Sequence, residues 1–196
     1  MARAILLALF FLPGVVCAQA FKGGVQGGLS MSQVDGDRYA GFHKTGGWCE
    51  VFVEYPISKK TALHLGISGV QKGSYKEFSE QEFYRMSLIY AEVPVLVQYR
   101  IASKAVLEGG LGLGVLAYSK EETEMGPLSS IDSPAFNSFE LSAQGGVKYF
   151  FWSRAGGAVK LSYSVLPIRD TKQNSMYRRS SGQFNNLIQL SLFYML

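Results

Sequence analysis

Histidine and cysteine, the side chains that most often carry acid–base, nucleophilic or metal chemistry, are scarce in this chain. The two histidines are His43 and His64, and neither has a Cys, Asp or second His at a spacing typical of a metal site. A membrane-embedded hydrolase or acyltransferase that used His43 with Asp35, Asp37 or a loop serine is the enzymatic alternative, but no spacing supports it. We therefore expect no catalytic, cofactor-binding or metal-binding residues.

Ion pairing inside the protein is the chemistry that the charged residues indicate. Five of them lie in segments that are otherwise apolar or rich in small residues: Glu50, Glu54, Glu108, Lys148 and Lys160. Buried charges persist only when they are paired and hydrogen-bonded, so we expect the carboxylates to neutralise the lysines, with Gln98 and Gln144 filling the remaining bonds. Lys148 and Lys160 would lie directly across two strands if their turn were symmetric about Arg154. In the alternative, both lysines extend to the mouth of the fold and meet water.

The elements that would position these charges alternate apolar and polar side chains with a period of two. In residues 90–118, Val93, Val95 and Val97 alternate with Glu92 and Gln98, and a short connection at 101–104 divides the stretch into two strands. This predicts an antiparallel hairpin with one apolar face. The pattern recurs, and we expect eight strands in all: 21–32, 46–55, 61–70, 90–100, 105–118, 138–151, 157–165 and 184–196.

Glycines spaced as in some phosphate-binding loops occur at Gly110, Gly112 and Gly114. A phosphate-binding loop opens a helix, whereas these glycines lie within an expected strand and no helix start follows them. All three have the parity of the polar face. We expect them to give room inside the fold and to ease its curvature.

The connections between the expected strands alternate in length. Residues 56–60, 101–104 and 152–156 are short, whereas 33–44, 73–87, 119–137 and 166–183 are long. Outer-membrane barrels combine an even number of strands with short periplasmic turns and long extracellular loops. We therefore predict an all-β fold, an eight-stranded antiparallel up-and-down transmembrane β-barrel, with both termini in the periplasm.

Two of the long connections carry opposite charge. Residues 119–137 contain one lysine and four acidic residues, net −3, and residues 166–183 contain four basic residues and one Asp, net +3. These connections could dock on one another, or the basic one on phosphates of the outer leaflet. Two solvated, disordered loops are the alternative.

A barrel with its apolar face inside would instead be a soluble, lipocalin-like carrier. The polar face consists largely of Gly, Ser, Gln and a few Glu, which suits a narrow, packed lumen better than a surface in water. Aromatic residues of the apolar parity also gather at the short-turn ends of the strands: Phe21, Tyr55, Tyr99, Tyr149, Phe151 and Tyr194. They are typical of a girdle at a membrane interface, and they favour lipid outside the barrel.

The N-terminal segment has the features of a secretory signal peptide. Arg3 precedes an apolar run at 5–16, which ends in Cys17-Ala18-Gln19-Ala20. We expect a signal peptide at residues 1–20 and one barrel domain at 21–196, with lipid modification of Cys17 as an alternative. Cys49 is then the single cysteine, which excludes an intramolecular disulfide. No later run approaches the ~20 apolar residues of a membrane helix, and the net charge of +4 is too dispersed for nucleic-acid binding.

Four segments resemble the PorT-like family of small outer-membrane β-barrel proteins: residues 24–30 (GVQGGLS), 71–73 (QKG), 90–97 (YAEVPVLV) and 110–114 (GLGLG). The resemblance covers essentially the whole mature chain. It implies an eight-stranded outer-membrane barrel, in a family whose founding member is linked to a secretion system for surface proteins.

Two classes of function follow from these expectations. The first is a non-enzymatic, monomeric barrel with a side-chain-filled lumen, which sits in outer-membrane lipid and meets a protein partner of a secretion or envelope assembly. The second is a narrow pore or a small-ligand transport barrel. The lumen of an eight-stranded barrel is just wide enough for side chains, which favours the first class.

Overall fold

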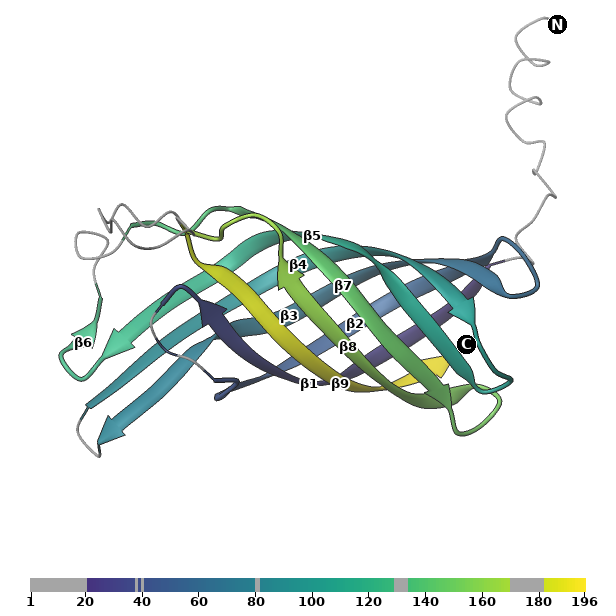
Figure 1. The fold of residues 1–196 in the computed structure, drawn as a ribbon, viewed down its shortest axis with the longest axis horizontal. Coiled ribbons are helices and arrows are strands. Elements are labelled where there is room, and N and C mark those ends of the chain that lie inside the picture. The colour runs from purple at the N-terminus through teal and green to yellow at the C-terminus, as the bar shows by residue number, and fades with distance from the viewer. Residues whose placement is uncertain (1–20, 38, 40, 80–81, 129–133, 170–181) are drawn as a thin grey trace, which may run out of the picture.

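The computed structural model describes residues 21–37, 39, 41–79, 82–128, 134–169 and 182–196, so the expected signal peptide at 1–20 lies outside the described residues. The described chain forms one sheet (Figure 1) of these strands: β1 (Lys22–Asp35), β2 (Lys44–Pro56), β3 (Thr61–Ser79), β4 (Glu82–Arg100), β5 (Ala105–Thr123), β6 (Gly126–Pro127), β7 (Phe139–Phe150), β8 (Ala155–Ser164) and β9 (Phe184–Met195). None of these residues belongs to a helix that could cross a bilayer.

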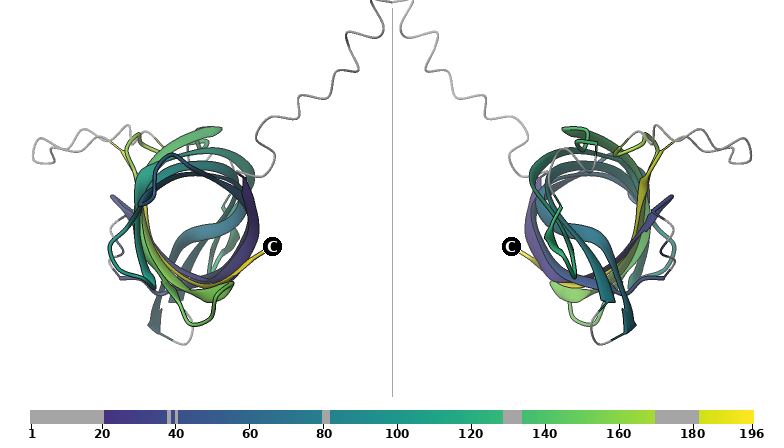
Figure 2. Two further views of the ribbon diagram at one scale, coloured as in Figure 1. Left: turned by 90° about the vertical axis from the view of Figure 1, so that its right-hand side faces the viewer. Right: turned by 90° about the vertical axis from the view of Figure 1, so that its left-hand side faces the viewer.

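The sheet closes on itself. Its strands follow the order β4-β3-β2-β1-β9-β8-β7-β5, every neighbouring pair is antiparallel, and β4 also pairs with β5. The end-on views show the resulting ring (Figure 2). β6 has only 2 residues and pairs with the end of β5, so it is not part of the wall. The predicted eight-stranded antiparallel barrel is therefore confirmed.

Side chains alternate between the lumen and the outer surface. On β5, for example, Leu107, Leu111 and Leu113 are exposed on the outside, whereas Glu108 and Gly112 are buried inside. A Cβ atom at Gly112 would collide with Nε2 of Gln144, so glycine at this position leaves space for the neighbouring side chain. The apolar outer band is the face that a barrel offers to lipid.

β3 and β4 extend much further toward their shared connection than the sequence pattern predicts. The expected long connection at 73–87 is wrong, because β3 continues to Ser79 and β4 begins at Glu82. In this extension Met86 and Leu88 are buried inside while Arg85 is exposed outside, the reverse of the alternation in the lipid band. A strand surrounded by water has its apolar side chains inside. Because the surroundings change along the strand, the pattern of the lipid band does not predict this extension.

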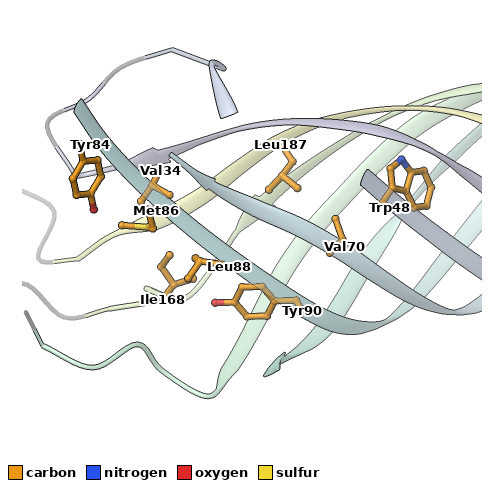
Figure 3. Close-up of a cluster of buried hydrophobic side chains, with 9 residues drawn as sticks. All are labelled: Val34, Trp48, Val70, Tyr84, Met86, Leu88, Tyr90, Ile168 and Leu187. Atoms are coloured by element: carbon orange, nitrogen blue, oxygen red, sulfur yellow. The ribbon is translucent and has the colours of Figure 1, made fainter. Parts of the chain in front are cut away.

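In the described residues, two apolar clusters occupy opposite ends of the lumen. The larger one lies toward the long connections (Figure 3): Val34, Trp48, Val70, Tyr84, Met86, Leu88, Tyr90, Ile168 and Leu187. The smaller one, of Phe52, Ala158, Phe193 and Met195, lies near the short turns. The buried charged residues are distributed along the lumen among these clusters.

Candidate functional site

The first buried ion cluster surrounds Lys148, whose side chain is 2% exposed. Its Nζ lies 3.2 Å from Oε1 of Glu54 and 3.5 Å from Oε2 of Glu108. Gln98 donates from Nε2 to the same two carboxylates, at 2.9 Å and 3.3 Å. The ammonium group also stands over the ring of Phe52, 4.4 Å from its centroid, where a cation is attracted electrostatically.

A second lysine forms its own pair in the same part of the lumen. Lys160 Nζ lies 3.3 Å from Oε2 of Glu50 and 4.7 Å from the centroid of the Trp48 ring. Oε1 of Glu50 in turn lies 2.6 Å from Nε2 of His64. The other ring nitrogen of His64 lies 3.6 Å from Glu54, so the histidine connects the Lys160 pair to the Lys148 cluster. We call these residues and Gln98 the turn-side ion cluster.

The structure thus brings together the five charged residues that the sequence singles out, but with a different register between the two lysines. Lys148 is opposite Ala158 and Lys160 is opposite Gly146, so the expectation that the lysines face each other directly is wrong. Phe150 pairs with Gly156, which centres the turn on Ser153 instead of Arg154. When the centre of the turn moves by one residue, the pairing between β7 and β8 moves by two residues. Each ammonium group then has its own carboxylate.

A further ion cluster around Lys72 was missed by the sequence reasoning. Lys72 is 1% exposed; its Nζ contacts Glu92 and lies 3.0 Å from both oxygens of Glu140. Ser164 and Asn185 also donate to Glu140, and Gln144 donates to Glu92. The positions of Glu92 and Glu140 in the alternating pattern indicate that both side chains point into the lumen, so this part of the cluster could have been found from the sequence. Lys72 lies beyond the expected end of its strand, and Glu140 is on β7, which is not a neighbour of β3.

A buried ion pair between Arg169 and Glu121 lies beyond the lipid band, where two of the long connections meet. Arg169 Nη1 donates to Oε1 of Glu121 at 3.0 Å, and the Tyr84 hydroxyl donates to the same oxygen at 2.6 Å. Burial, and then the hydrogen bond to this carboxylate, raise the pKa of Tyr84 above its usual value. Asn137 also bonds Pro167 and Ile168. The described ends of the acidic and basic connections therefore touch, while residues 129–133 and 170–181 lie outside the described residues.

The six aromatic residues of the expected girdle are exposed, and they lie toward the short-turn ends of their strands. Two pairs of rings are in contact: Phe21 with Tyr55 at 5.1 Å between centroids, and Tyr149 with Phe151 at 5.8 Å. Tyr99 pairs with Thr61 at the end of the β3–β4 ladder, and Tyr194 pairs with Ala155. Their placement fits an interface role, which stays a prediction.

Chemistry other than ion pairing has little support in the described residues. No group of three His, Cys, Asp or Glu side chains among them is placed to hold a metal ion. His43 is exposed in the connection between β1 and β2, and Cys49 is exposed on the outer surface. Gly110, Gly112 and Gly114 lie inside β5, not at the start of a helix.

Comparisons with known proteins agree with the architecture. A family model described as outer membrane protein beta-barrel domain matches residues 17–170. Among curated proteins, none matches the chain. Crystal structures of Ail, the attachment invasion locus protein of Yersinia pestis, share 16% identity and a TM-score of 0.56; one covers 89% of this chain and 98% of that chain. The complex of Ail with the heparin analogue sucrose octasulfate covers 90% and 99%.

Another outer-membrane barrel also matches the chain. Neisserial surface protein A has a TM-score of 0.45 and 10% identity, over 89% of this chain and 96% of that chain. At these identities the likeness extends to the fold alone.

Proposed function

Because the chain belongs to the family of outer membrane protein beta-barrel domains, we propose that it is a non-enzymatic, PorT-like barrel that serves a secretion or envelope assembly through its two ends. The observation that carries this proposal is the filled lumen. The turn-side ion cluster and the Lys72 cluster, together with two apolar clusters, place buried side chains along the barrel axis. A barrel filled in this way offers partners its rims and loops, not a channel.

The segments that resemble PorT-like proteins contribute to this filling. Lys72 lies in the segment at 71–73 and Glu92 in the segment at 90–97, and their side chains contact each other. The segments that carry the resemblance therefore include two residues of a buried ion pair inside the lumen. The partner in the proposal is tested by purifying the tagged barrel from membranes: recovery of secretion or envelope proteins supports it, and recovery of the barrel alone contradicts it.

The filled lumen predicts that the purified barrel does not conduct ions. In planar lipid bilayers we expect no conductance steps after insertion of the parent protein, because charged and aromatic side chains occupy the lumen at several levels. Flotation with lipid vesicles checks that the protein has inserted, and a porin added to the same chamber checks the bilayer. Regular conductance steps from the parent would instead favour the narrow pore.

The alternating connection lengths predict the orientation in the membrane. Met125, 93% exposed between β5 and β6, should face the outside of the cell, and Ser153 in the β7–β8 turn should face the periplasm. In a Cys49→Ala background, we expect a membrane-impermeant maleimide to label Met125→Cys on intact cells. Ser153→Cys should react only after the outer membrane is permeabilised. The opposite pattern would reverse the orientation.

A further inference from the structure

The three short turns share one backbone geometry. In each turn, two successive amide groups donate to the same carbonyl oxygen: Ile57 and Ser58 to Thr61, Ile101 and Ala102 to Ala105, and Phe151 and Trp152 to Ala155. The residue just before the accepting residue is basic every time, namely Lys60, Lys104 and Arg154. The geometry of the turn does not require a cation at this position, since turns favour Gly, Asn, Asp, Ser and Pro.

Three further basic residues lie at the same end of the barrel, and together they form what we call the basic rim: Lys22, Lys59, Lys60, Arg100, Lys104 and Arg154. All six are exposed, and within the described residues none of them makes an ion pair. The turns at 56–61, 100–105 and 151–155 contain no Asp or Glu. Within the described residues this end of the barrel therefore carries six cations that no side-chain carboxylate neutralises directly, and they give it a positive field.

The basic rim surrounds two cavities at the mouth of the lumen. One, of about 110 Å³, is lined by Lys22, Lys59, Lys60 and Arg100, with the paired Glu54 and Lys148 at the same site. The other, of about 570 Å³, is lined by Lys22, Arg100, Lys104 and Arg154 and by apolar side chains such as Trp152 and Met195. Among the described residues, Glu54 is the only side-chain carboxylate at either cavity, and it already binds Lys148 and Gln98.

We propose that the basic rim binds an acidic polypeptide segment of a periplasmic partner. This rests on the proposed function and its orientation, and it names the chemistry of the partner. Two adjoining cavities with cations and an apolar wall suit an extended chain that carries carboxylates and apolar side chains. Lipid head groups surround the outside of a barrel, whereas these cations line cavities at its mouth. A single small anion would leave most of the six cations unused.

The test is binding of a short fluorescein-labelled peptide of alternating Glu and Gly residues to the full barrel in zwitterionic nanodiscs, followed by fluorescence anisotropy. The same peptide with Gln in place of Glu should not bind. Removing three rim charges in Lys60→Gln/Lys104→Gln/Arg154→Gln should weaken binding about tenfold, since exposed charge pairs are individually weak. Circular dichroism confirms that this variant is folded.

A matched variant removes the same charge at the opposite end of the barrel: Lys44→Gln/Lys76→Gln/Lys120→Gln should bind like the parent. Equal weakening in both variants, or no binding by the parent, would overturn the proposal. Displacement by millimolar inorganic phosphate would identify a small-anion site instead, and loss of binding in nanodiscs with anionic phospholipid would identify a head-group site. Peptide binding by a conducting barrel would overturn only the closed lumen, whereas a silent barrel that binds no peptide would overturn only the rim proposal.

Discussion

Replacing Lys72 by Met is expected to lower the free energy of unfolding by about 3–5 kcal/mol, the cost of leaving buried charges without their partner. The Lys72 ammonium group is the cation that contacts both Glu92 and Glu140, and all three side chains are almost fully buried. Methionine fills a similar volume, so little of the loss should come from packing. Equilibrium unfolding by guanidinium in lipid vesicles, followed by tryptophan fluorescence, measures the change.

The matched variant Lys72→Met/Glu92→Gln/Glu140→Gln removes the carboxylate charges together with the ammonium charge. It should recover most of the lost stability, because neutral hydrogen-bonding groups replace the unpaired charges. A Lys72→Met barrel as stable as the parent would show that water solvates both carboxylates, and the lumen would then not be closed at this level. Removing the Glu108 carboxylate is a weaker test of buried ion pairing, because Lys148 still pairs with Glu54 in that variant.

The barrel and its two faces follow from the sequence because side chains in a strand alternate strictly. Once Leu111 and Leu113 are assigned to lipid, Glu108 and Gly112 must be inside, and the same step places Glu50 and Lys160 in one lumen. The alternation needs a uniform solvent on each face. Where β3 and β4 leave the lipid band the two faces meet other surroundings, and the alternation therefore does not predict these extensions of the two strands.

Which lysine pairs with which carboxylate across the lumen could not be predicted in the same way. Lys72 on β3 meets Glu140 on β7, and Lys160 on β8 meets Glu50 on β2, although neither pair of strands is adjacent. Such contacts depend on barrel curvature and on the register of every intervening pair. His64 shows the limit most clearly: it pairs with Glu54 across neighbouring strands, yet its close contact with Glu50 depends on side-chain direction.

An arginine at position 111 is expected to destabilise the barrel by about 2–4 kcal/mol in lipid, the cost of a lipid-facing Arg near the bilayer midplane. Leu111 lies in the middle of the exposed apolar part of β5, with Val95 and Ala143 beside it on the neighbouring strands. Its side chain has no route to water along the wall except past other apolar residues. The variant Leu111→Arg is measured by unfolding in lipid vesicles, as for Lys72→Met.

The control for Leu111→Arg is Ile101→Arg in the β4–β5 turn. Leu111 is 50% exposed and Ile101 is 52% exposed, so a barrel surrounded by water would tolerate both substitutions about equally. In lipid the turn residue reaches the aqueous side of the interface, and its substitution should change stability by no more than about 0.5 kcal/mol. The difference between the two variants therefore isolates the depth-dependent cost of the membrane from exposure itself. Equal stabilities would mean that the apolar band does not meet hydrocarbon, and the outward parity would need another explanation.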